Sequence, residues 1–184
     1  MSIATIDTAR RRLDDFLKIL KRTKYLYVEI SIPLELSKGY FEPTLLCFCW
    51  MDFLGGLYTG NPSPNSKGRI TAWLKSPYML KANTSYKTQA KKLFEGYRNG
   101  LVHGYAPEVF HLSYGDVLGH LTESGPGKVK IEIPTLIDHL IASVEEFGKQ
   151  LQSLPLTKKG KPRPGSIEAF EQSFKQIFPS LSFP

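Results

Sequence analysis

The sequence predicts a mainly helical single domain, a helical bundle that carries a small antiparallel β-hairpin or meander. Apolar residues recur at helical spacing in several segments, and one long segment is apolar at nearly every position. Between about residues 108 and 133 the apolar period changes to two, which is typical of strands. A chain of 184 residues with 41% hydrophobic residues can form one core without disulfides or a structural metal.

The N-terminal segment predicts an amphipathic helix followed by a short strand. Ser2 or Thr5 is a suitable N-cap for the helix. The core-facing positions of this helix are Ile6, Ala9, Leu13, Phe16, Leu17 and Leu20. Apolar and polar residues then alternate from Leu26 to Ile32, which predicts a strand that ends at Pro33.

The next segment, from Pro43 to about Gly60, is apolar on all sides and therefore predicts a central core helix. Its two cysteines, Cys47 and Cys49, point to different sides of a helix, so they cannot bridge each other or chelate one metal. We expect two buried free thiols, which suits a reducing cytoplasm. A loop at residues 61–65 leads to a third helix that is broken near Pro77.

The most regular helical pattern follows. This helix is expected to start near Asn83 or Thr84 and to stop by Gly104, with Pro107 just beyond. Its continuous apolar stripe consists of Tyr86, Ala90, Leu93, Phe94, Tyr97 and Leu101.

Three short strands are expected after this helix. They are Val109–Tyr114, Leu118–Thr122 and Lys128–Ile133, separated by glycine-rich turns. His111 and His120 either face each other across the hairpin or are two ordinary strand residues.

The C-terminal part predicts two more helices. Pro134 and Thr135, with Asp138 three residues on, resemble a capping box that opens the first of them. Residues 155–165 form a basic Pro/Gly linker, and an amphipathic helix follows. We therefore divide the chain into a bundle with its β insertion (1–154), the linker (155–165) and a C-terminal helix on the same domain (166–184).

Net charge and the apolar stretches indicate which partners and which cellular compartment to expect. A net charge of +7 and a pI of about 9.3 favour a polyanionic partner such as RNA, or serve solubility alone. The N-terminus does not resemble a signal peptide. The most apolar stretch, residues 44–58, is interrupted by Asp52 and is shorter than the roughly 20 residues of a membrane span. We expect a cytoplasmic protein without a membrane segment.

Several site types find no support in the sequence. It contains no glycine-rich phosphate loop of the usual spacing and no serine in a nucleophile elbow. The four histidines show no ligand spacing with cysteines or carboxylates, so we expect no metal and no cofactor.

The remaining candidate is the segment from Arg98 to His103, at the end of the most regular helix. In a regular helix the two side chains would lie about 140° apart and about 7.5 Å along the axis. They converge only if the last turn unwinds at Gly100 or Gly104, or if a two-fold axis brings in a second copy. The alternative is that both cations merely satisfy carbonyl groups at a helix end.

The order Arg98, Asn99, Gly100, Leu101, Val102, His103 resembles the motif of HEPN domains, in which an arginine, a polar residue and a histidine end a bundle helix. The resemblance covers the motif, its helix and, more loosely, the bundle plan; the strands after Tyr105 look like an insertion. It implies a metal-independent endoribonuclease, often dimeric, of the kind found in toxin–antitoxin and defence systems, with an antitoxin or defence protein as partner. The alternative is a non-catalytic HEPN-like module that binds nucleic acid or nucleotide, or acts as a scaffold.

The resemblance implies roles for particular residues. His103 would be the general acid or base and Arg98 would hold the scissile phosphate, because the 2′-OH of RNA supplies the nucleophile. Asn99 would orient His103 or a phosphate oxygen.

Four further residues complete the candidate site. Lys91, Lys92 and Tyr105 are assigned to nucleic-acid binding; the alternative for Tyr105 is that it simply packs. Asp52, a carboxylate in an apolar helix, is a supporting residue that needs Arg98 or Arg69 as partner, unless it lies on a solvated seam.

Overall fold

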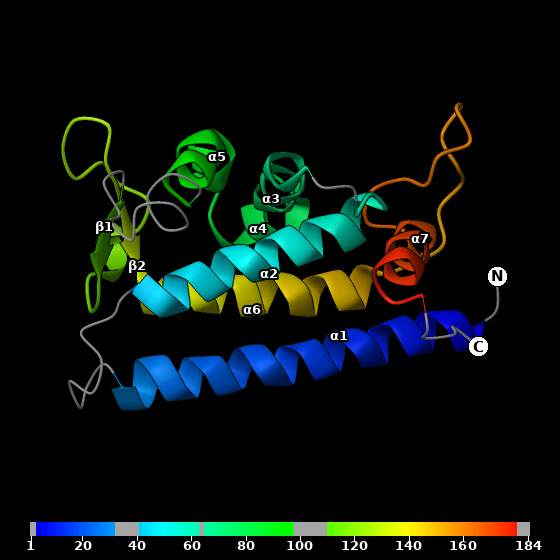
Figure 1. Cartoon of the computed structure of the whole chain (residues 1–184), viewed down its shortest axis with the longest axis horizontal. Helices are drawn as coiled ribbons and strands as arrows, with labels where there is room; N and C mark the ends of the chain where they lie inside the picture. The colour runs from blue at the N-terminus through cyan, green and yellow to red at the C-terminus, as the bar shows by residue number, and fades with distance from the viewer. Residues whose placement is uncertain (1–2, 32–40, 63–64, 98–109, 180–184) are drawn as a thin grey trace.

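The computed structural model describes residues 3–31, 41–62, 65–97 and 110–179. Three helices run side by side along the long axis of the molecule: α1 (Ile3–Thr23), α2 (Phe41–Thr59) and α6 (Ile133–Gln150). Shorter helices α3 (Ser66–Leu74), α5 (Tyr86–Glu95) and α7 (Ile167–Ile177) lie across them (Figure 1). The mainly helical fold class is thus confirmed.

Helix α2 is the centre of the bundle, as predicted, because it packs against α3, α6 and α7. Its inner side is formed by Cys47, Phe48, Met51, Leu54 and Leu57, all buried. The prediction of two buried thiols is wrong for Cys49, which is exposed on the other side of the helix. An apolar helix therefore keeps one open face.

The predicted strand from Leu26 to Ile32 is wrong over its described part. Residues Lys24–Ser31 form a π-helix that continues α1. No proline or glycine interrupts the chain between α1 and Ser31, so the helix propagates instead of starting a strand that would lack a partner. Lys24 pairs with Asp138 of α6 at 2.7 Å and Val28 is buried, which holds the extension against the bundle.

The predicted antiparallel hairpin is also wrong. Strands β1 (Phe110–Ser113) and β2 (Val129–Glu132) pair in parallel, with Phe110 opposite Val129. The middle strand, Leu118–Thr122, is replaced by the 3-10 helix η3 (Val117–Gly119) and a turn. Asp116 stabilises this turn, since its carboxylate accepts from the Gly119 amide and pairs with Lys130 at 2.7 Å. Within residues 110–133, antiparallel pairing occurs as an isolated bridge between Glu123 and Val129.

The other helices agree with the sequence, with one change of cap. The third predicted helix is split into α3 and α4 (Pro77–Ala82), so the break near Pro77 is confirmed. Helix α6 is capped by Glu132, not by Thr135 and Asp138: a Glu132 carboxylate oxygen accepts from the Thr135 amide at 2.7 Å. The other oxygen accepts from the Gly115 amide at 2.9 Å, so both oxygens of this buried carboxylate have a hydrogen-bond partner.

The described helices include none that is long and apolar enough to cross a membrane.

Replacing Gly55 with alanine should destabilise the fold. The added Cβ would lie 2.0 Å from the carbonyl oxygen of Arg69, so α2 and α3 would have to separate. We expect the free energy of unfolding to fall by about 2 kcal/mol or more, measured by urea denaturation.

Gly148→Ala is the matched control within α6. Its Cβ would lie 3.7 Å from Leu13 Cδ1, an ordinary contact. Alanine in a helix is favoured over glycine by up to about 1 kcal/mol, so this variant should be neutral or stabilised. Equal behaviour of the two variants would contradict the tight contact at Gly55.

Candidate functional site

The central candidates from the sequence, Arg98, Asn99, His103 and Tyr105, lie outside the described residues. The predicted end of their helix at Gly104 lies there too. What the structure provides is the position of the two flanks of this segment and the chemistry around them.

Both flanks contact the same side chain, Phe48 of α2. The ring of Tyr97 stacks on Phe48 with centroids 5.1 Å apart, and the ring of Phe110 stacks on it at 5.8 Å and nearly parallel. Gly96 lies so close to Phe110 that a Cβ would be 2.4 Å from the ring. The chain therefore enters and leaves residues 98–109 at one place over the core.

A polar hollow lies beside this place. It has a volume of about 240 Å³ and is lined by Cys49, Asp52, Phe53, Gly56, Pro62, Arg69 and Ile177. The Sγ of Cys49 is 3.7 Å from the hydroxyl of Tyr97, so the hollow adjoins the residue that precedes Arg98.

Asp52 and Arg69 form the polar pair of this hollow. The Arg69 guanidinium donates to both carboxylate oxygens, at 2.8 Å from Nε and 2.7 Å from Nη2. Nη1 donates to the carbonyl of Pro62 at 3.2 Å. The two side chains are only 15% and 22% exposed, so this two-point contact is partly shielded from solvent. Arg69 is one of the two partners that the sequence offered for Asp52.

The two lysines assigned to nucleic-acid binding lie on the outer side of α5, each beside a carboxylate. Lys92 pairs with Glu123 at 2.7 Å, and Lys91 lies 3.8 Å from Glu95. Because Lys91 is 77% exposed, its pairing is weak and its charge remains available to an anion.

Sequence reasoning missed a buried polar group formed by Tyr86, His120 and His139. The Tyr86 hydroxyl lies 2.9 Å from His120 Nε2 and 3.1 Å from His139 Nδ1. His120 Nδ1 accepts from the Glu132 amide at 3.2 Å. His120 therefore carries its proton on Nε2 and donates to Tyr86, which donates to His139 Nδ1. This direction gives the Tyr86 hydroxyl one donor and one acceptor, and the group joins α5, β2 and α6.

Burial keeps all three groups neutral. It lowers the pKa of His120 to about 4, with a further contribution from the neighbouring His139. Burial also lowers the pKa of His139 and raises that of Tyr86 well above its usual value. The sequence signal was weak, since Tyr86 fits the apolar stripe and the two histidines are 19 positions apart. The pairing of His111 with His120 is not observed: His111 is exposed.

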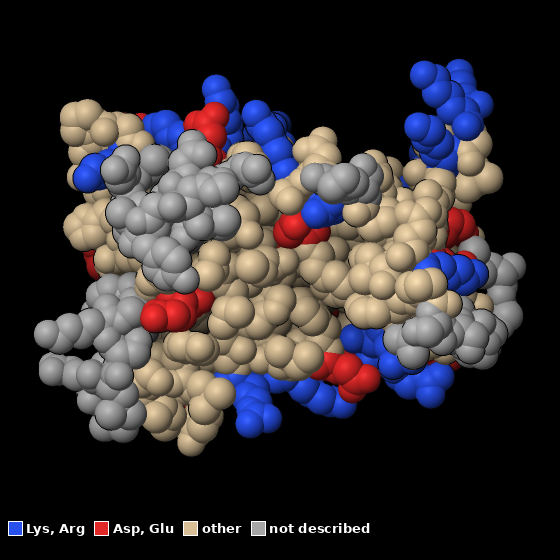
Figure 2. All heavy atoms as spheres, in the orientation of Figure 1, with Lys and Arg blue, Asp and Glu red and all other residues tan. Residues whose placement is uncertain are grey.

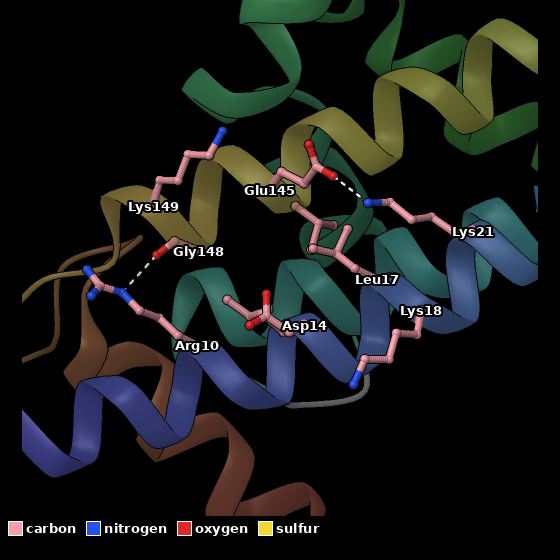
Figure 3. A pocket seen from close by; sticks show the side chains of 10 residues that line it. Arg10, Asp14, Leu17, Lys18, Lys21, Glu145, Gly148 and Lys149 are labelled. Carbon is pink, nitrogen blue, oxygen red and sulfur yellow. Dashed lines mark hydrogen bonds and ion pairs between the residues drawn. The ribbon is translucent and has the colours of Figure 1, made fainter.

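A larger groove, with a volume of about 660 Å³, lies between α1 and α6 (Figure 3). Three of its charged side chains, Arg10, Lys21 and Glu145, hold the two helices together. Arg10 donates to the Gly148 carbonyl at 3.2 Å, and Lys21 pairs with Glu145 at 2.8 Å. This arrangement is explained by helix packing.

No group of three or more histidine, cysteine, aspartate or glutamate side chains that could hold a metal ion occurs within residues 3–31, 41–62, 65–97 and 110–179. Comparison of the chain with protein-family models, with curated proteins and with solved structures finds no match.

The buried histidine should make the fold acid-labile. A histidine whose pKa is lower in the folded state stabilises the protein fully above its unfolded pKa of about 6.5 and loses this contribution as the pH falls. With a folded pKa of about 4, His120 alone should reduce the free energy of unfolding by about 3 kcal/mol between pH 6.5 and 4. Urea denaturation at a series of pH values measures this.

His120→Gln should lose most of this pH dependence, whereas His111→Gln, at an exposed position, should keep it. A wild-type stability that is flat from pH 6.5 to 4 would contradict the buried neutral histidine.

Proposed function

We propose that this chain is a metal-independent endoribonuclease whose catalytic residues are Arg98 and His103. The observation that carries the proposal is the HEPN-like order Arg98, Asn99, then His103, in the part of the sequence that follows α5. Two structural facts are consistent with it: the chain is mainly helical, and both flanks of residues 98–109 contact Phe48 beside a hollow that contains a guanidinium.

The proposed reaction uses the nucleophile of the substrate itself. The 2′-OH attacks the adjacent phosphorus, the bond from phosphorus to O5′ breaks, and the departing oxygen takes up a proton. The products are a 2′,3′-cyclic phosphate and a 5′-OH end. His103 moves protons because imidazole titrates near neutrality, and Arg98 binds the phosphate and stabilises the charge of the transition state.

The surrounding residues have supporting roles in this proposal. Asn99 orients His103 or a phosphate oxygen, and Tyr105 and Lys91 contact the RNA. Asp52 holds Arg69 by its two-point contact, so that a second guanidinium stays beside the start of the segment.

The proposed enzyme is a homodimer, which would bring two copies of the motif together. The open face of α2 supports this: Cys49 is exposed, while Leu46, Trp50 and Phe53 are only partly buried. Figure 2 shows a broad surface without charged side chains over the middle of α2 and between α2 and α1, while charged side chains line the lower edge of α1. Such a surface is a common site of protein association.

The proposed setting is the cytoplasm, in a toxin–antitoxin or defence system with a protein that restrains cleavage. The second candidate is a non-catalytic module that binds nucleic acid. The basic connection between α6 and α7, residues 155–165, favours it, because its lysines suit binding and contribute no catalytic group.

Incubation with single-stranded RNA or tRNA in EDTA tests the proposal. Wild-type protein should cleave, and His103→Ala should slow cleavage by about 10²–10⁴-fold because a general acid or base is lost. Arg98→Ala should reduce the rate by a similar factor. End-group analysis should find the 2′,3′-cyclic phosphate.

His111→Ala is the matched control, since it removes an exposed histidine on β1 and should leave the rate unchanged. Undiminished cleavage by His103→Ala would overturn the proposed mechanism. Binding without cleavage would favour the second candidate.

A charge on the open face of α2 should abolish the dimer. Leu46→Glu should shift the mass measured by analytical ultracentrifugation from two chains to one, because the carboxylate would be desolvated in the contact. Leu118→Glu, at a side chain that is 95% exposed on η3, should leave the mass unchanged. A wild-type protein that sediments as one chain at high concentration would exclude the dimer.

A further inference from the structure

The connection between α6 and α7, residues 155–165, projects from the body of the protein (Figure 1). We call it the basic loop. It carries Lys158, Lys159, Lys161 and Arg163, all exposed, in a chain whose net charge is +7. Figure 2 shows these blue side chains standing clear of the surface at the upper right. More than half of the excess positive charge thus resides in six consecutive residues.

The basic loop has its own hydrogen-bonded turn. The Thr157 amide donates to the Lys161 carbonyl at 2.8 Å, and the Gly160 amide donates to the Thr157 carbonyl at 2.8 Å. The Lys161 amide donates to the Thr157 hydroxyl at 3.0 Å. Gly160 has a φ of +69°, a conformation that suits glycine at this turn. The lysine-bearing tip therefore has a defined backbone.

The base of the basic loop is attached to the core. The Gly165 amide donates to the Tyr58 carbonyl of α2 at 2.7 Å, and Gln152 forms a bridge with Ser166. The Arg163 Nε donates to the carbonyl of Pro155 at 3.0 Å, which closes the two sides on each other. Three prolines in the loop, at positions 155, 162 and 164, further limit its conformations.

The charges of the basic loop have no anionic partner within it, because residues 155–165 contain no aspartate or glutamate. Elsewhere many lysines are paired, for example Lys24 with Asp138 and Lys81 with Glu146. Among the ion pairs of the described residues, none involves Lys158, Lys159 or Lys161. Like charges held together in this way repel one another, so an external polyanion would stabilise them.

We propose that the basic loop is a binding site for the phosphate backbone of RNA. Ammonium groups on flexible stems recognise phosphates as point charges, without reading the bases. No aromatic residue occurs in residues 155–165, so the loop lacks a surface for base stacking and for insertion among lipid headgroups. Its contribution is therefore electrostatic and independent of sequence.

This inference rests on the proposed function, since it names a part of the chain that binds the RNA substrate at a distance from the proposed catalytic residues. The exposed Lys87 and Lys91 of α5 continue the same kind of surface, and Figure 2 shows Lys and Arg gathering over α5 and on the loop along one edge of the molecule. An RNA strand lying on this edge would contact both.

The test is the salt dependence of RNA binding. A fluorescently labelled single-stranded RNA of about 20 nucleotides is titrated with His103→Ala protein, which prevents cleavage, at several salt concentrations. Each phosphate contact contributes about 0.7 to the slope of log Kd against log salt for single strands. Replacing Lys158, Lys159 and Lys161 by glutamine should flatten that slope by about 2. Arg163 is kept because it closes the loop.

The matched control replaces Lys67, Lys75 and Lys128 by glutamine, three exposed lysines outside the basic loop, which removes the same net charge. Its slope should stay near that of the parent. An unchanged slope in the loop variant, or an equal change in the control, overturns the proposal. So does binding of the protein to anionic phosphatidylserine vesicles without binding to RNA.

The two proposals fail separately. If wild type does not cleave but RNA binding depends on the basic loop, the ribonuclease is wrong and the binding site stands. If wild type cleaves through His103 and binding ignores the loop, the reverse holds.

Discussion

The packing around Phe48 is the contact on which the arrangement of this protein depends. Its ring lies in the core on α2 and stacks with Tyr97 on one side of residues 98–109 and with Phe110 on the other. The same helix contacts α3 closely enough at Gly55 to exclude any side chain there. Helix α2 therefore contacts α3, the residues that lead into β1, and both flanks of the candidate segment. A change in its packing would be felt at all three.

The helices could be predicted because each has an apolar face at helical spacing, while the β unit could not be predicted in detail. Alternation at Leu26–Ile32 looked like a strand, yet a strand needs a partner, and local propagation from α1 required none. Between β1 and β2, the contacts of Asp116 with Gly119 and Lys130 stabilise a 3-10 turn where a strand was predicted. Long-range ion pairs of this kind leave no periodic signal in a sequence.

Some residues around the candidate site could be predicted from the sequence, and others could not. A spacing such as Arg98 to His103 can be read directly. One carboxylate in an apolar helix indicated a shielded ion pair, and Asp52 and Arg69 form a partly buried one. The chain of Tyr86, His120 and His139 could not be found, because Tyr86 satisfies the apolar stripe of α5 and its partners come from distant elements. Cys49 is the converse: an apolar neighbourhood predicted burial, but the fold leaves that side of α2 open.

The interior of the fold holds neutral polar groups, whereas the cationic side chains of the basic loop lie at the surface. The histidines inside the fold are kept neutral, since protonation of His139 would leave the Tyr86 hydroxyl facing two donors and its own proton without an acceptor. That group joins α5, β2 and α6, the elements on either side of residues 98–109, so the flanks of the candidate segment rest on uncharged contacts. The cationic side chains of the basic loop instead project into solvent, on a turn that is held by hydrogen bonds within the loop and by the contact of Gly165 with α2. A polyanion can therefore bind there without disturbing the core contacts on which the flanks of the segment depend.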